Sequence, residues 1–362
     1  MSFQYYNPVA STLGCGVIDQ LPEILGGRRA FVITFPEAKA LGLLDRVTSV
    51  LGDQLIGIDD QVQPNPDVAE LAASYSQFWT RHSACDVIIA LGGGSAIDTA
   101  KAFMVGTQTD RFDDLLTLLS TGKPFVPHKT KRLIAVPTTA GTGSEVTPWA
   151  TIWDRVRGKK YSLHLNETWP EAAVIDAELM LTLPASVTVQ SGLDALSHAL
   201  ESIWNRNANP LSRAFAVSAA REVIETLPAL LKNMQSKDLR LAMASAALKA
   251  GMAFSNTKTA LAHSISYEMT LKHGLPHGIA CSFTLPMVMT RAIGIDADCD
   301  CALADIFGGD LAKAPQKLEQ FLQSVGVQTA FSDYGVSDEE SNQMVINALD
   351  GVRGRNFIGA AA

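Results

Sequence analysis

The chain has 362 residues, of which 47% are hydrophobic and 18% are charged, and it carries a formal net charge of −8. This composition is typical of a globular protein, and the length predicts about two domains. Because an acidic chain repels a phosphate backbone, nucleic acid is excluded as an expected partner.

Neither a signal peptide nor a membrane span is expected from the sequence. The N-terminus lacks a basic start followed by an apolar run, and the most apolar windows are shorter than the ~18 residues that a span requires. The five cysteines are scattered and odd in number, which is typical of a reducing cytosol rather than of a disulfide framework. We therefore expect a cytoplasmic protein with no membrane partner.

Short aliphatic runs alternate with helical patterns through the first half of the chain. The expected strands and the helices between them cover 29–34, 37–52, 54–59, 67–82, 86–91 and 132–136. Strands that are apolar on both faces and alternate with amphipathic helices predict a parallel sheet covered on both sides. A hairpin is expected over 150–165, with Gly158 near its turn.

After residues 182–186 the pattern changes to helical spacing almost to the end of the chain. Breaks between helices are expected at Asn209-Pro210, Gly274-Leu275-Pro276 and Gly308-Gly309. The sequence therefore predicts an α/β domain over residues 1–183 and an all-helical domain over residues 184–362. Small-molecule sites favour the cleft between two such domains.

Residues 92–95, Gly-Gly-Gly-Ser, follow a buried strand and precede a helix. Glycines allow a close backbone approach to an anion, and the N–H groups at a helix start face it. Asp98 favours the same helix start. The pattern predicts a phosphate-binding loop, and a tight turn that needs glycine only for its backbone angles is the alternative. It matches neither the G-x-G-x-x-G dinucleotide fingerprint nor a P-loop.

A second polar glycine loop follows the next strand, over residues 135–149. Gly141 and Gly143 offer open backbone in this loop. Its hydroxyl groups come from Thr138, Thr139, Thr142 and Ser144. Two such loops at the C-terminal ends of parallel strands fit a ligand that lies across the crevice of the sheet. We therefore expect a nucleotide with a pyrophosphate.

Asp194 and His198 lie four residues apart in a helical stretch, so their side chains share one face of the helix. Taken alone, this spacing favours a local hydrogen bond between the two side chains over a pair of metal ligands. The positions of other histidines are therefore needed to choose between the two interpretations.

Three of the seven histidines lie in residues 259–282. His263 and His277 are separated by about 21 Å along an unbroken helix, which is too far to share one ion. Gly274 and Pro276 end one helix and start another, so the chain can fold back and bring both rings together.

One carboxylate and three imidazoles would suit Fe(II), Zn(II), Mn(II) or Co(II) if Asp194, His198, His263 and His277 meet. The alternative is a set of buried histidines that are hydrogen-bonded to the backbone. Spacing alone leaves both interpretations open.

Four motifs occur in order along the chain: LGGGSAIDTAK, PTTAGTGSEVT, SGLDALSHALE and LPHGIA. With them, the chain resembles the iron-dependent, or group III, alcohol dehydrogenase superfamily over roughly residues 7–355. The resemblance implies a dinucleotide-binding α/β domain over 1–183 and a helical metal- and substrate-binding domain over 184–362, with iron between them. It implies metal ligands at Asp194, His198, His263 and His277.

The resemblance and the loop analysis together predict the cofactor contacts. These are Gly92, Gly93, Gly94, Ser95, Asp98, Thr138, Thr139, Thr142 and Lys160. Trp149 is expected on the pocket wall, where some relatives have a smaller polar residue, and Phe254 and Asn256 are expected on the other side.

Two departures from the family pattern bear on function. Phe35 stands where many relatives have an aspartate that holds the adenosine ribose, so NADPH becomes admissible beside NADH. Tyr267 stands where many relatives have a histidine that is thought to relay protons, and His273 lies further along. Tyr267 and His273 are therefore the candidate catalytic residues, with His273 the candidate relay.

The resemblance implies hydride transfer between NAD(P)H and a small aldehyde or primary alcohol, with Fe(II) as the metal and Zn(II) as its alternative. The stretch from Ala262 to Pro286 is most similar to the branch that reduces phosphonoacetaldehyde to 2-hydroxyethylphosphonate. Arg206, Lys258 and Lys272 are candidate cations for the phosphonate, unless they are ordinary surface charges. Relatives also lead us to expect a homo-oligomer, most simply a homodimer.

Three other functions compete with this one. A general short-chain alcohol or lactaldehyde-type dehydrogenase would share every motif. A lyase of the dehydroquinate synthase kind shares the architecture and uses NAD transiently, but its metal set resembles Glu/His/His. A non-enzymatic metal-binding role would leave the two nucleotide loops without a purpose.

Overall fold

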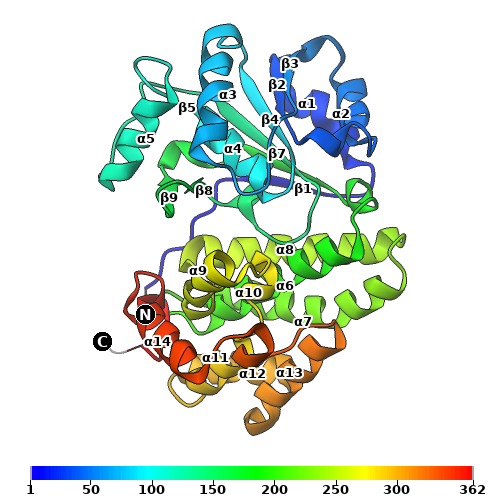
Figure 1. Cartoon of the computed structure of the whole chain (residues 1–362). Coiled ribbons are helices and arrows are strands. Elements are labelled where there is room, and N and C mark those ends of the chain that lie inside the picture. Colours follow the sequence, from blue (N-terminus) through cyan, green and yellow to red (C-terminus); the bar gives the residue numbers. More distant parts are fainter. Residues whose placement is uncertain (1, 361–362) are drawn as a thin grey trace. The chain divides into compact units, whose positions relative to one another are not determined.

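A computed structural model describes residues 2–360, which form two compact units (Figure 1). The first, here called the α/β unit, comprises Pro8–Thr139 and Ser144–Thr182. The second, the helical unit, holds the chain from Leu183 onward, the N-terminal segment that ends at Asn7, and the short segment Ala140–Gly143. The chain therefore enters the helical unit once at Ala140, well before the long helices begin.

The α/β unit is built on a six-stranded sheet in which all neighbouring strands are parallel. In spatial order its strands are β1 (Ala10–Gly14), β10 (Ala172–Asp176), β7 (Arg132–Pro137), β4 (Val87–Gly92), β2 (Ala30–Ile33) and β3 (Leu55–Asp59). The expected parallel sheet is confirmed. The register of β4 on β7 pairs Gly92 with Pro137, so the two polar loops leave the sheet side by side.

Helices cover both faces of this sheet because its central strands are apolar on both sides. Alternate residues of β2 belong to different cores: Phe31 and Ile33 pack with α3 and α4, whereas Ala30 and Val32 pack with α1 and α2. The helices are α1 (Leu21–Leu25), α2 (Leu43–Leu51), α3 (Val68–Arg81), α4 (Gly94–Met104) and α5 (Phe112–Thr121). Two small pairs accompany the sheet, β5 (Val105–Gly106) with β6 (Lys129–Thr130), and β8 (Trp149–Asp154) with β9 (Lys159–His164).

The hairpin β8–β9 matches its prediction, and Gly158 takes a left-handed φ of 59° beside its turn. The helix expected over 37–52 is shorter than predicted. A 3-10 turn covers Pro36–Ala38, and α2 starts only at Leu43 because Gly42 precedes it with a φ of 74°. A residue in that conformation cannot continue a right-handed helix.

The helical unit contains α6 (Ala185–Ile203), α7 (Pro210–Lys232), α8 (Lys237–Thr257), α9 (Leu261–His273), α10 (His277–Ala280), α11 (Leu285–Ala292), α12 (Ala297–Phe307), α13 (Ala314–Ser324) and α14 (Asp338–Asp350). The helix α6 packs against α7, α8 and α10 and is buried from Gly192 to its end. Asn209 caps α7 by accepting hydrogen bonds from the N–H groups of Leu211 and Ser212. Among the described residues, no helix combines the length and apolarity that crossing a membrane would require.

Candidate active site

The four predicted metal ligands lie together in the helical unit. Asp194 and His198 come from α6, His263 comes from α9 and His277 starts α10. From Oδ1 of Asp194, the Nε2 atom is 3.4 Å away in His263, 3.6 Å in His198 and 3.8 Å in His277. Three imidazole nitrogens and one carboxylate oxygen thus face a common point.

The turn between α9 and α10 explains how two distant histidines meet. The helix α9 ends at His273, and Gly274 follows it with a left-handed φ of 68°. Pro276 then precedes His277 at the start of α10. This reversal leaves the rings of His263 and His277 with their centroids 5.5 Å apart, as the glycine and proline predicted.

Glu201 orients His263 and was not predicted from the sequence. Its carboxylate is fully buried and lies 2.7 Å from Nδ1 of His263. It also accepts hydrogen bonds from the backbone N–H groups at the start of α9, including those of Ala260 and Ala262. A proton on Nδ1 directed at Glu201 leaves the Nε2 lone pair of His263 facing the cluster, which is the usual arrangement behind a metal-bound imidazole.

The cluster fits a divalent metal ion. Among the residues that the structure describes, Nε2 of His263 is buried and makes no hydrogen bond of acceptable geometry, although Asp194 lies close to it. Buried polar atoms are rarely left in this state. A cation bound to Nε2 and to the oxygen of Asp194 would satisfy both atoms.

Charge states in the cluster favour the same interpretation. Burial would raise the pKa of Asp194, but the imidazoles around it, His198 foremost, hold that pKa far below its usual range. Burial lowers the pKa of His198 to about 4 despite the carboxylate beside it. At neutral pH, therefore, Asp194 is an anion and His198 is a neutral lone-pair donor.

Cys281 is a further group near the cluster that the sequence analysis missed. The ligand atoms of Asp194, His263, His277 and Cys281 all lie within 4.8 Å of one another. Burial raises the pKa of the Cys281 thiol well above its ordinary value, and Sγ lies 3.5 Å from Oδ1 of Asp194. Because only a thiolate binds metal well, we assign Cys281 as a donor to Asp194 and keep neutral His198 as the fourth ligand.

Phe254 lies beside the cluster, where its ring stacks on that of His198 with centroids 4.0 Å apart, and its place on the pocket wall stays a prediction. A Cβ atom on Gly143 would lie 2.7 Å from the Phe254 ring, and one on Gly141 would lie 2.4 Å from the carbonyl oxygen of Ser191 on α6. Both glycines of the second loop are thus needed so that Ala140–Gly143 can pack on α6 and α8. This requirement replaces the expected open backbone for a nucleotide.

The first glycine loop joins β4 to α4 in the α/β unit. Gly93 caps α4, and a Cβ atom on Gly92 would lie 2.7 Å from that of Ala96. The N–H group of Thr138 donates to the carbonyl of Gly92, which fixes the neighbouring loop. Tight packing around a helix start is compatible with phosphate binding, and the cofactor contacts at Gly94, Ser95 and Thr139 stay predictions.

Asp98 joins a buried polar network that ties α4 to the second loop and the hairpin. Its carboxylate accepts hydrogen bonds from Oγ of Ser144 at 2.6 Å and from the N–H of Thr151 at 2.8 Å. Nζ of Lys101 donates to Ser144 and to the carbonyl oxygen of Trp149. Both oxygens of Asp98 are therefore occupied within the protein, which assigns it a structural role rather than the predicted cofactor contact.

Other predicted residues are distributed over both units. Lys160 lies with Nζ 5.0 Å from the centre of the Trp153 ring, and the Trp149 ring lies 5.4 Å from that of His164. Thr142 belongs to Ala140–Gly143 and thus to the helical unit. Direct cofactor or substrate contacts of Lys160, Trp149 and Thr142 stay predictions.

Asn256 does not point at the metal cluster. Its side-chain amide pairs with both backbone groups of Tyr6, at 2.9 and 3.0 Å, and so holds the N-terminal segment. Asn256 thus has a structural contact, and its place on the pocket wall stays a prediction.

The two candidate catalytic residues lie at different points of α9. Tyr267 is one turn beyond His263 on the same face of the helix. His273 is about 15 Å along the helix from His263, where its Nε2 lies 3.2 Å from Oε1 of Glu340 on α14. The position of Tyr267 suits a role in the chemistry better than that of His273.

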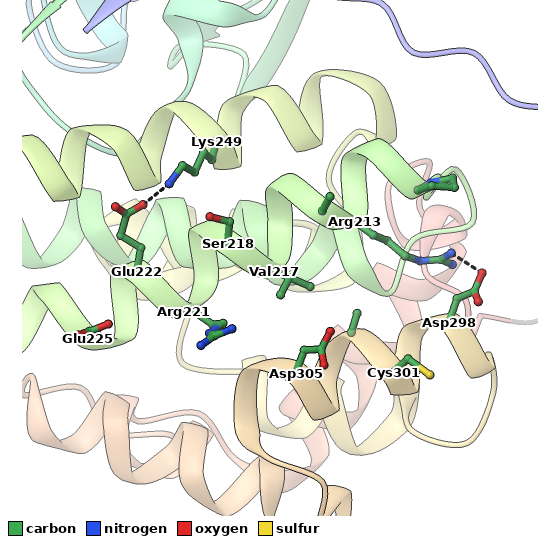
Figure 2. Close-up of a pocket in the computed structure, with 13 residues that line it drawn as sticks. Arg213, Val217, Ser218, Arg221, Glu222, Glu225, Lys249, Asp298, Cys301 and Asp305 are labelled. Carbon is green, nitrogen blue, oxygen red and sulfur yellow. Dashed lines mark hydrogen bonds and ion pairs between the residues drawn. The ribbon is translucent and has the colours of Figure 1, made fainter. Parts of the chain in front are cut away.

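A groove of about 730 Å³ lies elsewhere in the helical unit, and none of the predicted metal ligands lines it. Figure 2 shows two ion pairs among its charged side chains, Glu222 with Lys249 and Arg213 with Asp298. Compensated surface charges of this kind supply no reactive group. The chemistry of the metal cluster, not the size of the groove, therefore identifies the candidate site.

Comparison with known families supports the assignment of this cluster as the candidate active site. Residues 8–177 match the family model described as Iron-containing alcohol dehydrogenase, and residues 188–361 match that described as Fe-containing alcohol dehydrogenase family, C-terminal. The chain belongs to the iron-containing alcohol dehydrogenase family. It is an enzyme, and the prediction of an oxidoreductase of the alcohol dehydrogenase type is confirmed.

Individual members of the iron-containing alcohol dehydrogenase family resemble this chain along nearly their whole length. The chain is 31% identical to the NAD-dependent methanol dehydrogenase of Bacillus methanolicus, with 96% of this chain and 93% of the relative covered. It is 28% identical to the sulfoacetaldehyde reductase of Bilophila wadsworthia, with 94% and 90% covered. The solved structure of sulfoacetaldehyde reductase from Bifidobacterium kashiwanohense in complex with NAD+ superposes with a TM-score of 0.90 at 28% identity, covering 99% of this chain and 94% of the other.

Proposed function

We propose that this enzyme reduces a small aldehyde to a primary alcohol with hydride from NAD(P)H, and that its preferred substrate is phosphonoacetaldehyde, which becomes 2-hydroxyethylphosphonate. One observation carries the chemical part of this proposal. Asp194 and three imidazoles converge on one point, and Glu201 holds His263 with its Nε2 lone pair directed there.

An aldehyde with an acidic group is favoured by two lines of support. The first is the resemblance of the stretch from Ala262 to Pro286 to the phosphonoacetaldehyde branch, which is an expectation from the sequence. Two of the similar proteins are named sulfoacetaldehyde reductases, whose substrate has a sulfonate in place of the phosphonate. Sulfoacetaldehyde is therefore the second candidate substrate.

Residues of the helical unit prepare the site for this reaction. A divalent metal, when bound by Asp194, His198, His263 and His277, supplies Lewis-acid polarisation of the aldehyde oxygen. Glu201 fixes the tautomer of His263, and Phe254 holds the ring of His198 in place. His277 keeps 43% of its side chain exposed, so substrate can approach the cluster from that side.

The hydride comes from the nicotinamide cofactor, which we propose binds through the Gly92–Ser95 loop and the amide groups at the start of α4. Phe35, the second residue after β2, leaves no carboxylate at that place to repel a 2′-phosphate, so both NADH and NADPH are proposed as donors. Tyr267, one turn from His263, is the proposed proton donor to the nascent alcohol.

An aldehyde panel tests the proposal. Phosphonoacetaldehyde, sulfoacetaldehyde, propanal and lactaldehyde are each incubated with NADH or NADPH and with iron-loaded or zinc-loaded protein, and the loss of absorbance at the nicotinamide band is followed. Phosphonoacetaldehyde is expected to give the highest kcat/KM. Faster reduction of propanal or lactaldehyde would contradict the substrate, and the absence of net cofactor turnover with every aldehyde would contradict the proposed reaction.

A further inference from the structure

Arg353 is a partly buried cation that has no anionic partner among the residues that the structure describes. Within the described part of the chain, its guanidinium forms neither an ion pair nor a hydrogen bond, and Cζ lies 4.7 Å from the centre of the Tyr267 ring. Burial lowers its pKa, so the surroundings oppose its charge. A guanidinium in such a position is best stabilised by a group with two or more acceptor oxygens.

The position of Arg353 relates it to the metal cluster. Its ring partner Tyr267 lies one turn after His263 on the same face of α9. Gly351, two residues before Arg353, packs so closely on α9 that a Cβ atom there would lie 3.3 Å from Oγ of Ser264. Because residues four apart on a helix have Cβ atoms ~6 Å apart, the guanidinium, which lies against the Tyr267 ring, is near the part of α9 that carries His263.

The negative charge of Glu201 raises the pKa of Arg353 and so opposes the lowering caused by burial. Glu201 is itself committed to His263 and to the start of α9, and it does not contact the guanidinium as an ion-pair partner. The cation is therefore near the metal cluster without being neutralised by it.

We propose that Arg353 binds the tetrahedral oxyanion, phosphonate or sulfonate, at the far end of the substrate, and that the Tyr267 ring holds its guanidinium in place. This inference rests on the proposed function, because it assumes that the aldehyde end of the same molecule reaches the metal cluster. The inference requires that a two-carbon aldehyde with an acidic end reaches both groups at once. Arg353 would then explain why an acidic aldehyde is preferred over a neutral one.

The three cations named from the sequence suit this role less well. Arg206 donates to the backbone carbonyls of Phe357 and Ala360 and holds the end of the chain. Lys272 is exposed and paired with Glu268. Lys258 is exposed at the end of α8, where water already stabilises its charge.

Substitution of Arg353 tests the inference through substrate preference. The ratio of kcat/KM for phosphonoacetaldehyde to that for propanal is measured for the wild type, Arg353→Met, Arg353→Lys and the control Arg355→Met, whose guanidinium is exposed. Because a hydrogen-bonded charge contributes roughly a 10- to 100-fold effect, Arg353→Met is expected to lower the ratio by that factor. Arg353→Lys should restore part of it, and Arg355→Met should leave it unchanged. An equal loss with both aldehydes in Arg353→Met would indicate a merely structural role and overturn the inference.

Binding without turnover gives a second readout. Methylphosphonate and methanesulfonate are titrated calorimetrically into metal-free protein, and each is expected to bind to the wild type and to Arg355→Met but not to Arg353→Met. The stronger of the two identifies the preferred acidic group. Loss of binding in Lys258→Met instead of Arg353→Met would assign the anion to Lys258 and overturn the inference.

The two readouts separate this inference from the proposed function. If the wild type prefers phosphonoacetaldehyde and Arg353→Met keeps the same preference, the function stands and the role of Arg353 is wrong. If the wild type prefers propanal but methylphosphonate binds only when Arg353 is present, the anion site stands and the proposed substrate is wrong.

Discussion

Each compact unit buries a polar cluster, and the two clusters differ in how their atoms are satisfied. In the α/β unit, Ser144 connects Lys101 to Asp98, accepting from one and donating to the other. In the helical unit, Asp194 and its three imidazoles face one another without a hydrogen bond that satisfies Nε2 of His263. The polar atoms of the first cluster satisfy one another, whereas the second leaves a buried nitrogen that a bound cation would satisfy.

This difference separates polar groups that maintain a fold from those that bind a ligand. Burial alone does not discriminate between them, since Lys101 and His263 are both almost inaccessible to solvent. The candidate site is distinguished by an unsatisfied buried nitrogen that lies among further metal-ligating groups: Nε2 of His263 lies 3.4 Å from a carboxylate oxygen that two other imidazoles also approach.

The largest effect is expected from Asp194→Asn, which removes the only negative charge among the four ligands. The variant should lose its bound metal, and kcat/KM should fall by roughly 10³-fold or more, because Lewis-acid stabilisation contributes several kcal/mol. Metal content by mass spectrometry and steady-state kinetics measure this. Asp298→Asn, at an exposed ion pair with Arg213, is the control, and retention of full metal content in Asp194→Asn would contradict the assigned site.

Lys101→Met should disrupt the buried hydrogen-bond network of Lys101, Ser144 and Asp98 in the α/β unit without changing metal binding. Asp98 and Glu145 would lose the nearby cation, and removing one member of a buried charged group costs about 3–5 kcal/mol. Urea unfolding should report this loss of stability while metal content per folded molecule stays constant. A variant as stable as the wild type would show that the network contributes nothing to the fold.

Glu145 makes the α/β unit sensitive to pH. Burial raises its pKa from 4.5 to about 7, so the folded protein binds a proton that the unfolded chain has released between these values. This stabilisation is fully present below about pH 4.5 and is lost as pH rises through 7, an effect of at most about 3 kcal/mol. Unfolding free energies at pH 5 and pH 8 should therefore differ less in Glu145→Gln than in the wild type, and equal differences would rule out this residue as the cause.

The smallest of these effects is expected from Glu201→Gln, which keeps the shape of the side chain that orients His263 but removes its charge. Loss of such a carboxylate behind a ligand lowers metal affinity about 10- to 100-fold. A chelator competition assay measures the affinity, and Glu222→Gln, at a surface pair with Lys249, is the control. If Glu201→Gln binds metal as tightly as the wild type, the hydrogen bond to His263 does not tune the site.

Much of the fold follows from patterns that are local in the sequence. The strands β2, β4 and β7 and the hairpin were predicted because their apolar runs and turn residues are contiguous. The strands β1 and β10 were not. The former is a half-exposed edge strand of small polar residues, and the latter is a short run whose identity depends on pairing with distant residues.

The same distinction applies to the site. Asp194, His198, His263 and His277 could be named because a helical spacing and a glycine–proline break allow them to meet, and because the resemblance of the motifs to a known family implied that they share a metal. Glu201 and Cys281 could not, since their roles depend on how α6 packs against α9 and α10. Buried acidic residues inside a motif, such as the final glutamate of SGLDALSHALE, are the signal that could have identified Glu201.

The segment Ala140–Gly143 belongs to the helical unit, and this has a practical consequence. This four-residue segment lies in the first half of the chain. Its glycines lack the Cβ atoms that would collide with α6 and α8, near His198 and Phe254. A fragment that starts at Leu183 would carry every metal ligand but would lack the piece that covers them. The helical unit therefore cannot be expressed as the single stretch from Leu183 onward. Any chimera between relatives has to exchange Ala140–Gly143 together with that stretch.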